Sequence, residues 1–337
     1  MAGPTCALVG SGGVSMGEDM EQRLPDRGQN SQKPTLANSL AVETPLRRFA
    51  RNYFASRVAT ISLIVLIIIV LAAIFASLIA PQNPYDLSQI DILDSRLPPG
   101  AHSTMHSTAH ELTYLLGTDQ QGRDMLSAIL YGVRISITVG VVSTVVALAI
   151  GLALGLFAAY VGGRTENFIM RAADIQLSFP SILIALILLA VMGPGLGKII
   201  FALIAVQWAY YARTARSAAL VERGKEYMEA ARGLGLSSTR IIFRHLLPNC
   251  LPPLIAIAAL QVASAITLEA TLSFLGLGLP VTEPSLGLLI ANGFEYLLSG
   301  KYWISLFPGI ALMITVVVIN LVADQLRDVL NPRLQKQ

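Results

Sequence analysis

The hydrophobic pattern of the chain consists of long apolar stretches separated by short charged connections. Five stretches contain no Asp, Glu, Lys or Arg and have roughly the 20 residues that a helix needs to cross a bilayer. They are Val58–Tyr85, Ile135–Gly163, Ile175–Gly197, Cys250–Leu268 and Tyr302–Ala323. A sixth, Ile199–Ala212, reaches this length only if the helix continues past Arg213 and Arg216 toward Leu220, with both side chains snorkelling to the surface. We therefore predict an all-α membrane protein with six transmembrane helices.

The basic residues indicate which side of the membrane each connection occupies. If the N-terminus is inside, most of the 24 Lys and Arg residues fall in connections on that side. Such an excess of positive charge marks the cytoplasmic side of a membrane protein, so both termini are expected in the cytoplasm. The net charge of +3 therefore reflects topology, and nucleic acid is not expected as a partner.

These criteria divide the chain into segments. Residues 1–45 are rich in Gly, Ser, Pro and Gln and are expected to be a disordered cytoplasmic tail. Residues 46–80 combine a basic, aromatic interfacial helix with the first span, a retained anchor because the preceding segment is too long and polar for a secretory signal. The other segments are an extracytoplasmic loop (81–134), a core of five spans (135–323) with an inside loop (213–248), and a cytoplasmic tail (324–337).

Composition supports the membrane assignment and limits other chemistry. The chain is 54% apolar and 13% charged, with a mean hydropathy of +0.62, whereas soluble proteins are about a quarter charged. Cys6 and Cys250 do not suggest a disulfide framework. The sequence contains no phosphate-binding loop of the form G-x-x-x-x-G-K-[ST]. We expect no cofactor and no ATP hydrolysis by this chain.

Three histidines in the extracytoplasmic loop have the spacing of a metal site. His102, His106 and His110 are four residues apart, so on a helix they would share one face and could hold a transition metal. A short His-Ser-Thr repeat in a loop that tolerates insertions explains the same residues. We favour the repeat and predict no metal site.

The sequence Gly117–Asp124 precedes the second span. Its two glycines favour a tight turn that bonds to itself. Asp119, Arg123 and Asp124 are candidates for a local ion-pair network, and a simple helix-initiating turn explains them as well.

Small residues and prolines within the spans indicate close helix packing and bends. Gly151 and Gly155 form a small-xxx-small pattern that lets two helices approach closely in lipid. Pro180, Pro252 and Pro253 are expected to bend their helices or leave carbonyls free.

Polar residues in or beside the spans are candidates for lining a translocation path. The same side chains could instead hydrogen-bond between helices. No acidic residue lies near the centre of a predicted span, whereas an ion-coupled carrier is expected to bury one at depth. The candidates are Gln207, Gln261, Ser264, Glu269 and Asn292.

The inside loop has the pattern of two short helices joined by glycines. An amphipathic helix is predicted from Leu220 to Arg232, and Gly233 and Gly235 end it. A second short helix follows and is expected to end at Pro248, where Asn249 would cap the fifth span. A rigid projection of this kind is typical of a docking surface for another protein.

The sequence of this loop resembles the EAA signature of bacterial ABC-importer permeases. Glu229-Ala230-Ala231 is followed after three residues by Gly235 and then by Leu247-Pro248, with His245 where the signature has isoleucine. Gly117–Asp124 and Ser273–Pro280 resemble the C-type subunit of the dipeptide/oligopeptide permease family. The resemblance covers the chain from about residue 46 to its end and leaves out the N-terminal tail and the His-Ser-Thr repeat.

The resemblance implies a fold, a location and a division of labour. It implies a type I ABC-importer permease fold in the bacterial inner membrane. It implies a non-catalytic, pore-forming subunit that imports di- or oligopeptides with a homologous B-type permease, two cytoplasmic ABC ATPases and an extracytoplasmic solute-binding protein, surrounded by membrane lipid. It also implies that Gly235 forms an elbow and that the following residues couple to an ATPase: Glu229, Ala230, Ala231, Arg232, Gly235, Leu247 and Pro248.

Two other functions are weighed against this one. A transporter of the same class that imports nickel or another metal chelate shares the signature, and the three histidines favour it. An ion-coupled secondary carrier would transport without any ATPase, but the spans offer it no acid at depth.

Overall fold

A computed structural model describes residues 45–103 and 113–330 of the chain. The predicted tail, except for its last residue, lies outside the described residues, as do His106, His110 and the last seven residues. The helices and strands are α1 (Pro45–Phe54), α2 (Arg57–Ile74), α3 (Ala76–Ile79), β1 (Ala101–His102), β2 (Thr113–Tyr114), α4 (Met125–Val161), α5 (Gly163–Leu177), α6 (Ser181–Met192), α7 (Leu196–Arg223), α8 (Glu226–Gly233), α9 (Ser238–Arg240), α10 (Leu247–Phe274), α11 (Leu286–Phe294) and α12 (Trp303–Leu330). Short 3-10 turns at Leu87–Gln89, Ile92–Asp94 and Leu297–Ser299 and a π-helical turn at Ile241–Leu246 complete them.

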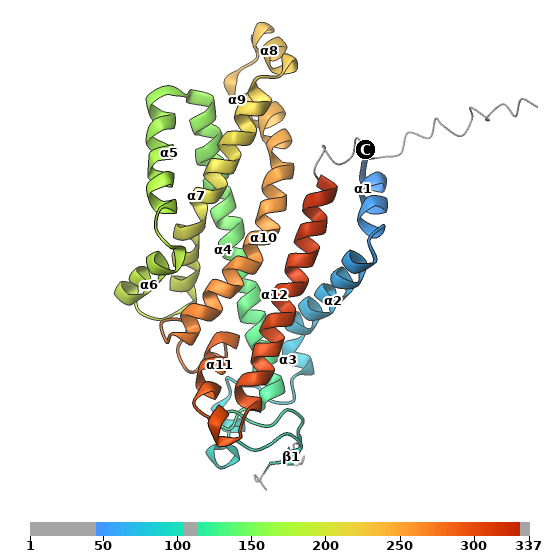
Figure 1. Cartoon of the computed structure of the whole chain (residues 1–337), viewed down its shortest axis with the longest axis vertical. Helices are drawn as coiled ribbons and strands as arrows, with labels where there is room; N and C mark the ends of the chain where they lie inside the picture. The colour runs from blue at the N-terminus through green and yellow to red at the C-terminus, as the bar shows by residue number, and fades with distance from the viewer. Residues whose placement is uncertain (1–44, 104–112, 331–337) are drawn as a thin grey trace, which may run out of the picture. The chain divides into compact units, whose positions relative to one another are not determined.

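The long helices pack side by side, and the short elements gather at their two ends (Figure 1). Helix α4 packs against α7 and α10, and α12 packs against α10 and α2. In the view of Figure 1, α8 lies at the upper end, whereas α11 and β1 lie at the lower end. Helix α1 and the last turns of α12 lie toward the α8 end. This arrangement agrees with a topology in which the inside loop and both ends of the described part of the chain share one side, although which side is cytoplasmic stays a prediction.

Within the described residues, four helices are long and apolar enough to cross a membrane. They are α2, α4, the continuous helix Ser238–Phe274 and α12. The bent pair α5 and α6 makes a fifth if it counts as one span. Helix α7 carries Lys198, Gln207 and Arg213 and does not meet the same criterion. The all-helical membrane class is therefore confirmed, and the count of six spans stays a prediction.

The third predicted span is broken rather than straight. Residues 175–197 are divided between the end of α5 and the 12-residue α6, which meet at an angle of 88°. Pro180 directly precedes α6, and its missing N–H cannot continue the ladder of α5. The prediction that Pro180 bends its helix is thus confirmed. Whether this bent pair is the third predicted span stays part of the untested count of six.

The small-xxx-small pattern brings α4 and α7 into contact. A Cβ atom added at Gly151 would lie 2.5 Å from Trp208 O, and one added at Gly155 would lie 2.4 Å from Ala212 O. Both distances are far below van der Waals contact, so only glycine permits this approach. The predicted role of Gly151 and Gly155 is confirmed.

The connection from the inside loop to the fifth span is continuous. Helix α9, the π-helical turn and α10 form one helix, Ser238–Phe274. Pro248 lies in its path without ending it, because the π-helical turn changes the register of the ladder and Leu247 N–H donates to Ile242 O. Asn249 Nδ2 donates to His245 O (2.6 Å), supporting the helix instead of capping a new one. The predicted break at Pro248 is therefore wrong.

Candidate functional site

Helix α8 is the eight-residue helix that projects from the inside loop. Glu226 and Glu229 lie in its first turn, where acidic side chains interact favourably with the helix dipole. Lys225 precedes the helix, and its Nζ lies 2.5 Å from Glu222 Oε1 at the end of α7. This ion pair closes the turn between α7 and α8.

One face of α8 is buried against the bundle. Met228 is fully buried and Ala231 is 5% exposed. Both belong to an apolar cluster that also contains Ile241, Leu246 and Cys250. The cluster therefore attaches α8 to the π-helical turn and to the first turns of α10.

Gly235 forms the turn that follows α8. Its φ of +70° lies in the left-handed region that favours glycine. The N–H of Gly235 donates to Arg232 O (3.0 Å) and that of Leu236 donates to Ala231 O (3.3 Å). These two bonds make a Schellman cap, which satisfies carbonyls at the end of the helix. The predicted glycine elbow is confirmed as a geometric feature.

The residues of the EAA triplet face in different directions. Glu229, Ala230 and Arg232 are exposed, whereas Ala231 is buried in the chain's own core. Ala231 therefore packs α8 against the bundle, and Glu229 and Ala230 lie on the outer surface of α8. The contact of these residues with an ATPase stays a prediction.

The second part of the signature lies at the start of α10. Pro248 is exposed and Leu247 is partly buried against the cluster that holds α8. Both residues follow the π-helical turn directly. Pro248 is thus available to a partner on the same end of the bundle as α8 (Figure 1).

Three predicted path residues line one groove. Gln207, Gln261 and Ser264 border a groove of about 380 Å³ between α6, α7, α10 and α12. Gln207 Oε1 also accepts a hydrogen bond from Thr144 Oγ1 (3.3 Å), so this side chain both lines the groove and links two helices. The groove is also bordered by Ser181, Tyr210, Thr267, Thr271 and Asn320, which were not singled out in the sequence.

A helical spacing in the sequence could have identified part of this groove. Gln261, Ser264, Thr267 and Thr271 lie three or four residues apart on α10 and so share one face. In an otherwise apolar span, a polar stripe of this kind indicates an aqueous surface or a polar helix contact. The contribution of Asn320 from α12 depends on tertiary packing and gives no such signal.

The other two predicted path residues do not line the groove. Glu269 is fully buried and accepts hydrogen bonds from Ser136 Oγ on α4 (2.9 Å) and Ser273 Oγ (2.8 Å). Asn292 lies on α11, and its Nδ2 makes no hydrogen bond to the described part of the chain. The alternative of helix–helix hydrogen bonding therefore holds for Glu269.

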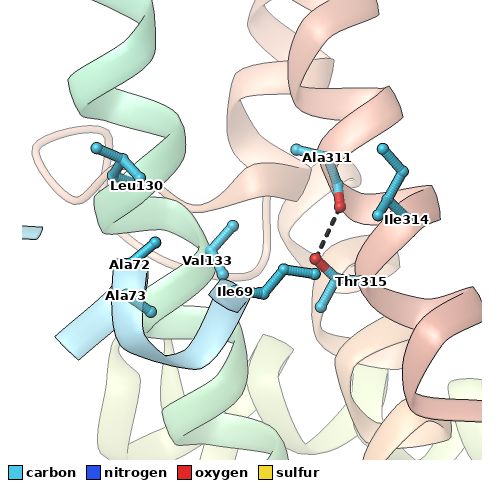
Figure 2. Close-up of a pocket in the computed structure, with 8 residues that line it drawn as sticks. All are labelled: Ile69, Ala72, Ala73, Leu130, Val133, Ala311, Ile314 and Thr315. Carbon is cyan, nitrogen blue, oxygen red and sulfur yellow. Dashed lines mark hydrogen bonds between the residues drawn. The ribbon is translucent and has the colours of Figure 1, made fainter. Parts of the chain in front are cut away.

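A second cavity, of about 190 Å³, lies between α2, α4 and α12 (Figure 2). Its lining is apolar apart from Thr315, whose Oγ1 donates to Ala311 O within its own helix (2.8 Å). The donor proton of this hydroxyl is thus used within α12. This cavity is unsuited to a polar substrate. Its lining residues are Ile69, Ala72, Ala73, Leu130, Val133, Ala311, Ile314 and Thr315.

The turn before α4 contains part of the predicted ion-pair network. Arg123 Nε lies 2.7 Å from Asp119 Oδ2, and both side chains are 1% exposed. Asp124 instead accepts hydrogen bonds from Ser127 N (2.8 Å) and Ser127 Oγ (2.6 Å) and caps α4. The Asp119–Arg123 pair is confirmed, and Asp124 serves as a helix cap rather than as an ion-pair partner.

Only one residue of the histidine triplet is described. His102 lies in β1, and its Nδ1 is 3.1 Å from Thr113 Oγ1 in β2. His106 and His110 lie outside the described residues. Within the described ranges, no group of His, Cys, Asp and Glu has the arrangement of a metal site.

Comparisons with protein families match most of the chain. Residues 151–336 match the family described as binding-protein-dependent transport system inner membrane component. Residues 44–99 match the N-terminal transmembrane domain of oligopeptide transport permease C.

Named relatives and solved structures agree with these matches. The dipeptide transport system permease protein DppC of Escherichia coli strain K12 is 40% identical over 293 residues, 87% of this chain and 95% of that protein. The di/tripeptide transport system permease protein DppC of Pseudomonas aeruginosa is 35% identical over 302 residues, 90% of this chain and 97% of that protein. An inward-facing structure of the MetNI methionine ABC transporter has a chain that is 20% identical, with a TM-score of 0.51, covering 61% of this chain and 98% of its own length. The last comparison shows the type I importer fold alone.

Proposed function

The chain belongs to the family of binding-protein-dependent transport system inner membrane components, and we propose that it is the pore-forming permease subunit of an ATP-driven importer of di- and oligopeptides. The peptide substrate is supported by relatives named as dipeptide and di/tripeptide permeases. The chain itself is non-catalytic, so partner ATPases hydrolyse the ATP.

The observation that carries the proposal is the construction of α8. Glu229 and Ala230 face outward, while Met228 and Ala231 hold the helix against the bundle. The cap at Gly235 joins α8 to the continuous helix Ser238–Phe274, which runs the length of a span. A partner that grips α8 therefore acts on a transmembrane helix through a short, hydrogen-bonded connection.

The proposed partners follow from the exposed face of α8 and from the polar groove. Two cytoplasmic ABC ATPases bind α8 and its counterpart on a homologous B-type permease. The groove lined by Gln207, Gln261 and Ser264 faces that permease and forms part of the translocation path. An extracytoplasmic solute-binding protein delivers the peptide to the end of the bundle that carries α11 (Figure 1).

Substitutions at the elbow test the proposal in a reconstituted transporter. Gly235→Trp places a bulky residue in a left-handed conformation, and Glu229→Ala removes the outward carboxylate. We expect either change to reduce peptide uptake by about tenfold, the factor that corresponds to roughly 1.4 kcal/mol of lost interaction. Uptake is measured in proteoliposomes that contain both permeases, the ATPases and the binding protein.

Gly233→Ala is the matched control, because a Cβ atom there meets nothing within 4 Å. It should leave uptake unchanged. Unaltered uptake and ATPase association in Gly235→Trp would show that the elbow is not the coupling element.

A further inference from the structure

We propose that Glu222, Tyr227 and Asn249 form a hydrogen-bonded brace that holds α8 to both α7 and α10, and that Tyr227 is the positioning residue through which motion of α8 reaches the two spans. This inference rests on the proposed function. It goes beyond that function by naming the residues that transmit the motion inside the permease.

The brace joins three elements through one hydroxyl group. Tyr227 on α8 donates from its OH to Glu222 Oε2 at the end of α7 (2.8 Å). The same OH accepts a hydrogen bond from Asn249 Nδ2 in the first turn of α10 (3.1 Å). A phenolic hydroxyl donates one bond and accepts another, so both contacts are satisfied at once.

The protonation state of Tyr227 fixes the direction of its hydrogen bond to Glu222. Burial and the neighbouring Glu222 carboxylate raise the pKa of Tyr227 to about 12. The hydroxyl therefore keeps its proton across the physiological range and continues to donate to Glu222. Lys225 pairs with the other oxygen of that carboxylate (2.5 Å), which leaves Glu222 fixed from two sides.

The asparagine connects the brace to the π-helical turn. Asn249 Nδ2 donates to His245 O (2.6 Å) as well as to Tyr227 OH. An amide nitrogen carries two hydrogens, so it can make both bonds. Pro248 beside it has no N–H to donate, so Asn249 supplies a side-chain bond where the backbone ladder is weakened.

The positions of glycines show why α8 requires a directional contact. Gly224 precedes α8 and Gly235 follows it, so neither residue has a side chain that could fix the orientation of the helix. The apolar contacts of Met228 and Ala231 hold α8 against the bundle, but hydrophobic contact is non-directional. The brace sets the orientation that this contact leaves open.

Tyr227→Phe tests the brace, because it removes the hydroxyl and keeps the ring. In the reconstituted transporter, we expect ATPase association to stay unchanged and the number of ATP molecules hydrolysed per peptide imported to rise by at least about fivefold, the factor expected for one lost hydrogen bond, because the variant loses both bonds of the hydroxyl. Tyr302→Phe, at an exposed tyrosine near the start of α12, is the matched control and should leave this ratio unchanged.

A double-mutant cycle separates the brace from a general effect on folding. Asn249→Ala removes one of the two bonds that Tyr227→Phe removes. Adding it to Tyr227→Phe should therefore raise the ratio by less than the product of the two single effects. An unchanged ratio in Tyr227→Phe, lost ATPase association or purely multiplicative effects would overturn the brace. Failure of the proposed function is recognised separately, because the unaltered chain would then show no ATP-dependent uptake.

Discussion

Asp124 shows how a single carboxylate can be structural in a protein of this class. It caps α4 and is almost completely buried at 1% exposure. Burial raises the pKa of Asp124 above its usual range, although the bonds from Ser127 act in the opposite direction. The cost of burying the ionised carboxylate therefore offsets part of the stability that its hydrogen bonds contribute.

Replacing Asp124 by an uncharged residue that still caps α4 is expected to stabilise the protein or leave its stability unchanged. The folded state of the natural chain binds the Asp124 proton more tightly, so its free energy of unfolding falls as the pH rises through this pKa. Asp124→Asn keeps a capping side chain and should abolish that fall, whereas Asp124→Ala should cost about 1 kcal/mol through loss of the cap. Thermal unfolding of the purified subunit at several pH values measures both effects, and a large loss of stability in Asp124→Asn would contradict this role.

Residues also show where sequence reasoning succeeded and where it stopped. The left-handed turn at Gly235 was predictable, because a glycine after an amphipathic helix is a local signal. The burial of Glu269 was not, because its partner Ser136 lies 133 residues away. The inward face of Ala231 likewise depends on the packing of α8 against the π-helical turn.

At the scale of elements, apolar length predicted α2, α4 and α12 well, because a lipid-exposed span needs continuous hydrophobicity. Prolines were less reliable guides. Pro180 separates two helices at 88°, whereas Pro248, Pro252 and Pro253 lie within one continuous helix. A proline bend is therefore decided by the contacts around it. Gln176 next to the break accepts a hydrogen bond from Trp208 Nε1 (2.8 Å), a contact with α7 that the sequence did not reveal.

The contact between α4 and α7 gives a prediction at this scale. In Gly155→Ala, the new methyl group would lie 2.4 Å from Ala212 O and 2.6 Å from Ala215 Cβ. Separating the helices to relieve this clash should cost about 1–3 kcal/mol. The melting temperature of the purified subunit should fall accordingly.

Gly309→Ala on α12 is the control, because its new Cβ meets nothing within 4 Å. Its melting temperature should stay close to that of the natural chain. Equal melting temperatures for the two variants would mean that α4 and α7 do not approach as closely as described.

At the scale of the whole molecule, one long helix, Ser238–Phe274, connects the α8 elbow to the polar groove. The stripe of Gln261 and Ser264 on α10 faces the groove, and Ser238 begins the same continuous helix three residues after Gly235. Rotation or tilting of this helix would therefore change the groove and the elbow together. In the proposed function, this helix is the connection through which an ATPase bound at α8 would act on the groove.

The most direct test of the account is a cross-link between α8 and an ATPase. Ala230→Cys places a thiol on the exposed face of α8, and Leu298→Cys places one on a fully exposed residue between α11 and α12. Helix α11 lies at the opposite end of the bundle from α8 (Figure 1). In membranes containing the complete transporter, a short thiol cross-linker should join Ala230→Cys to the ATPase and leave Leu298→Cys unlinked to it. Reaction of Ala230→Cys only with reagents outside the cell, or a cross-link from Leu298→Cys to the ATPase, would contradict the account.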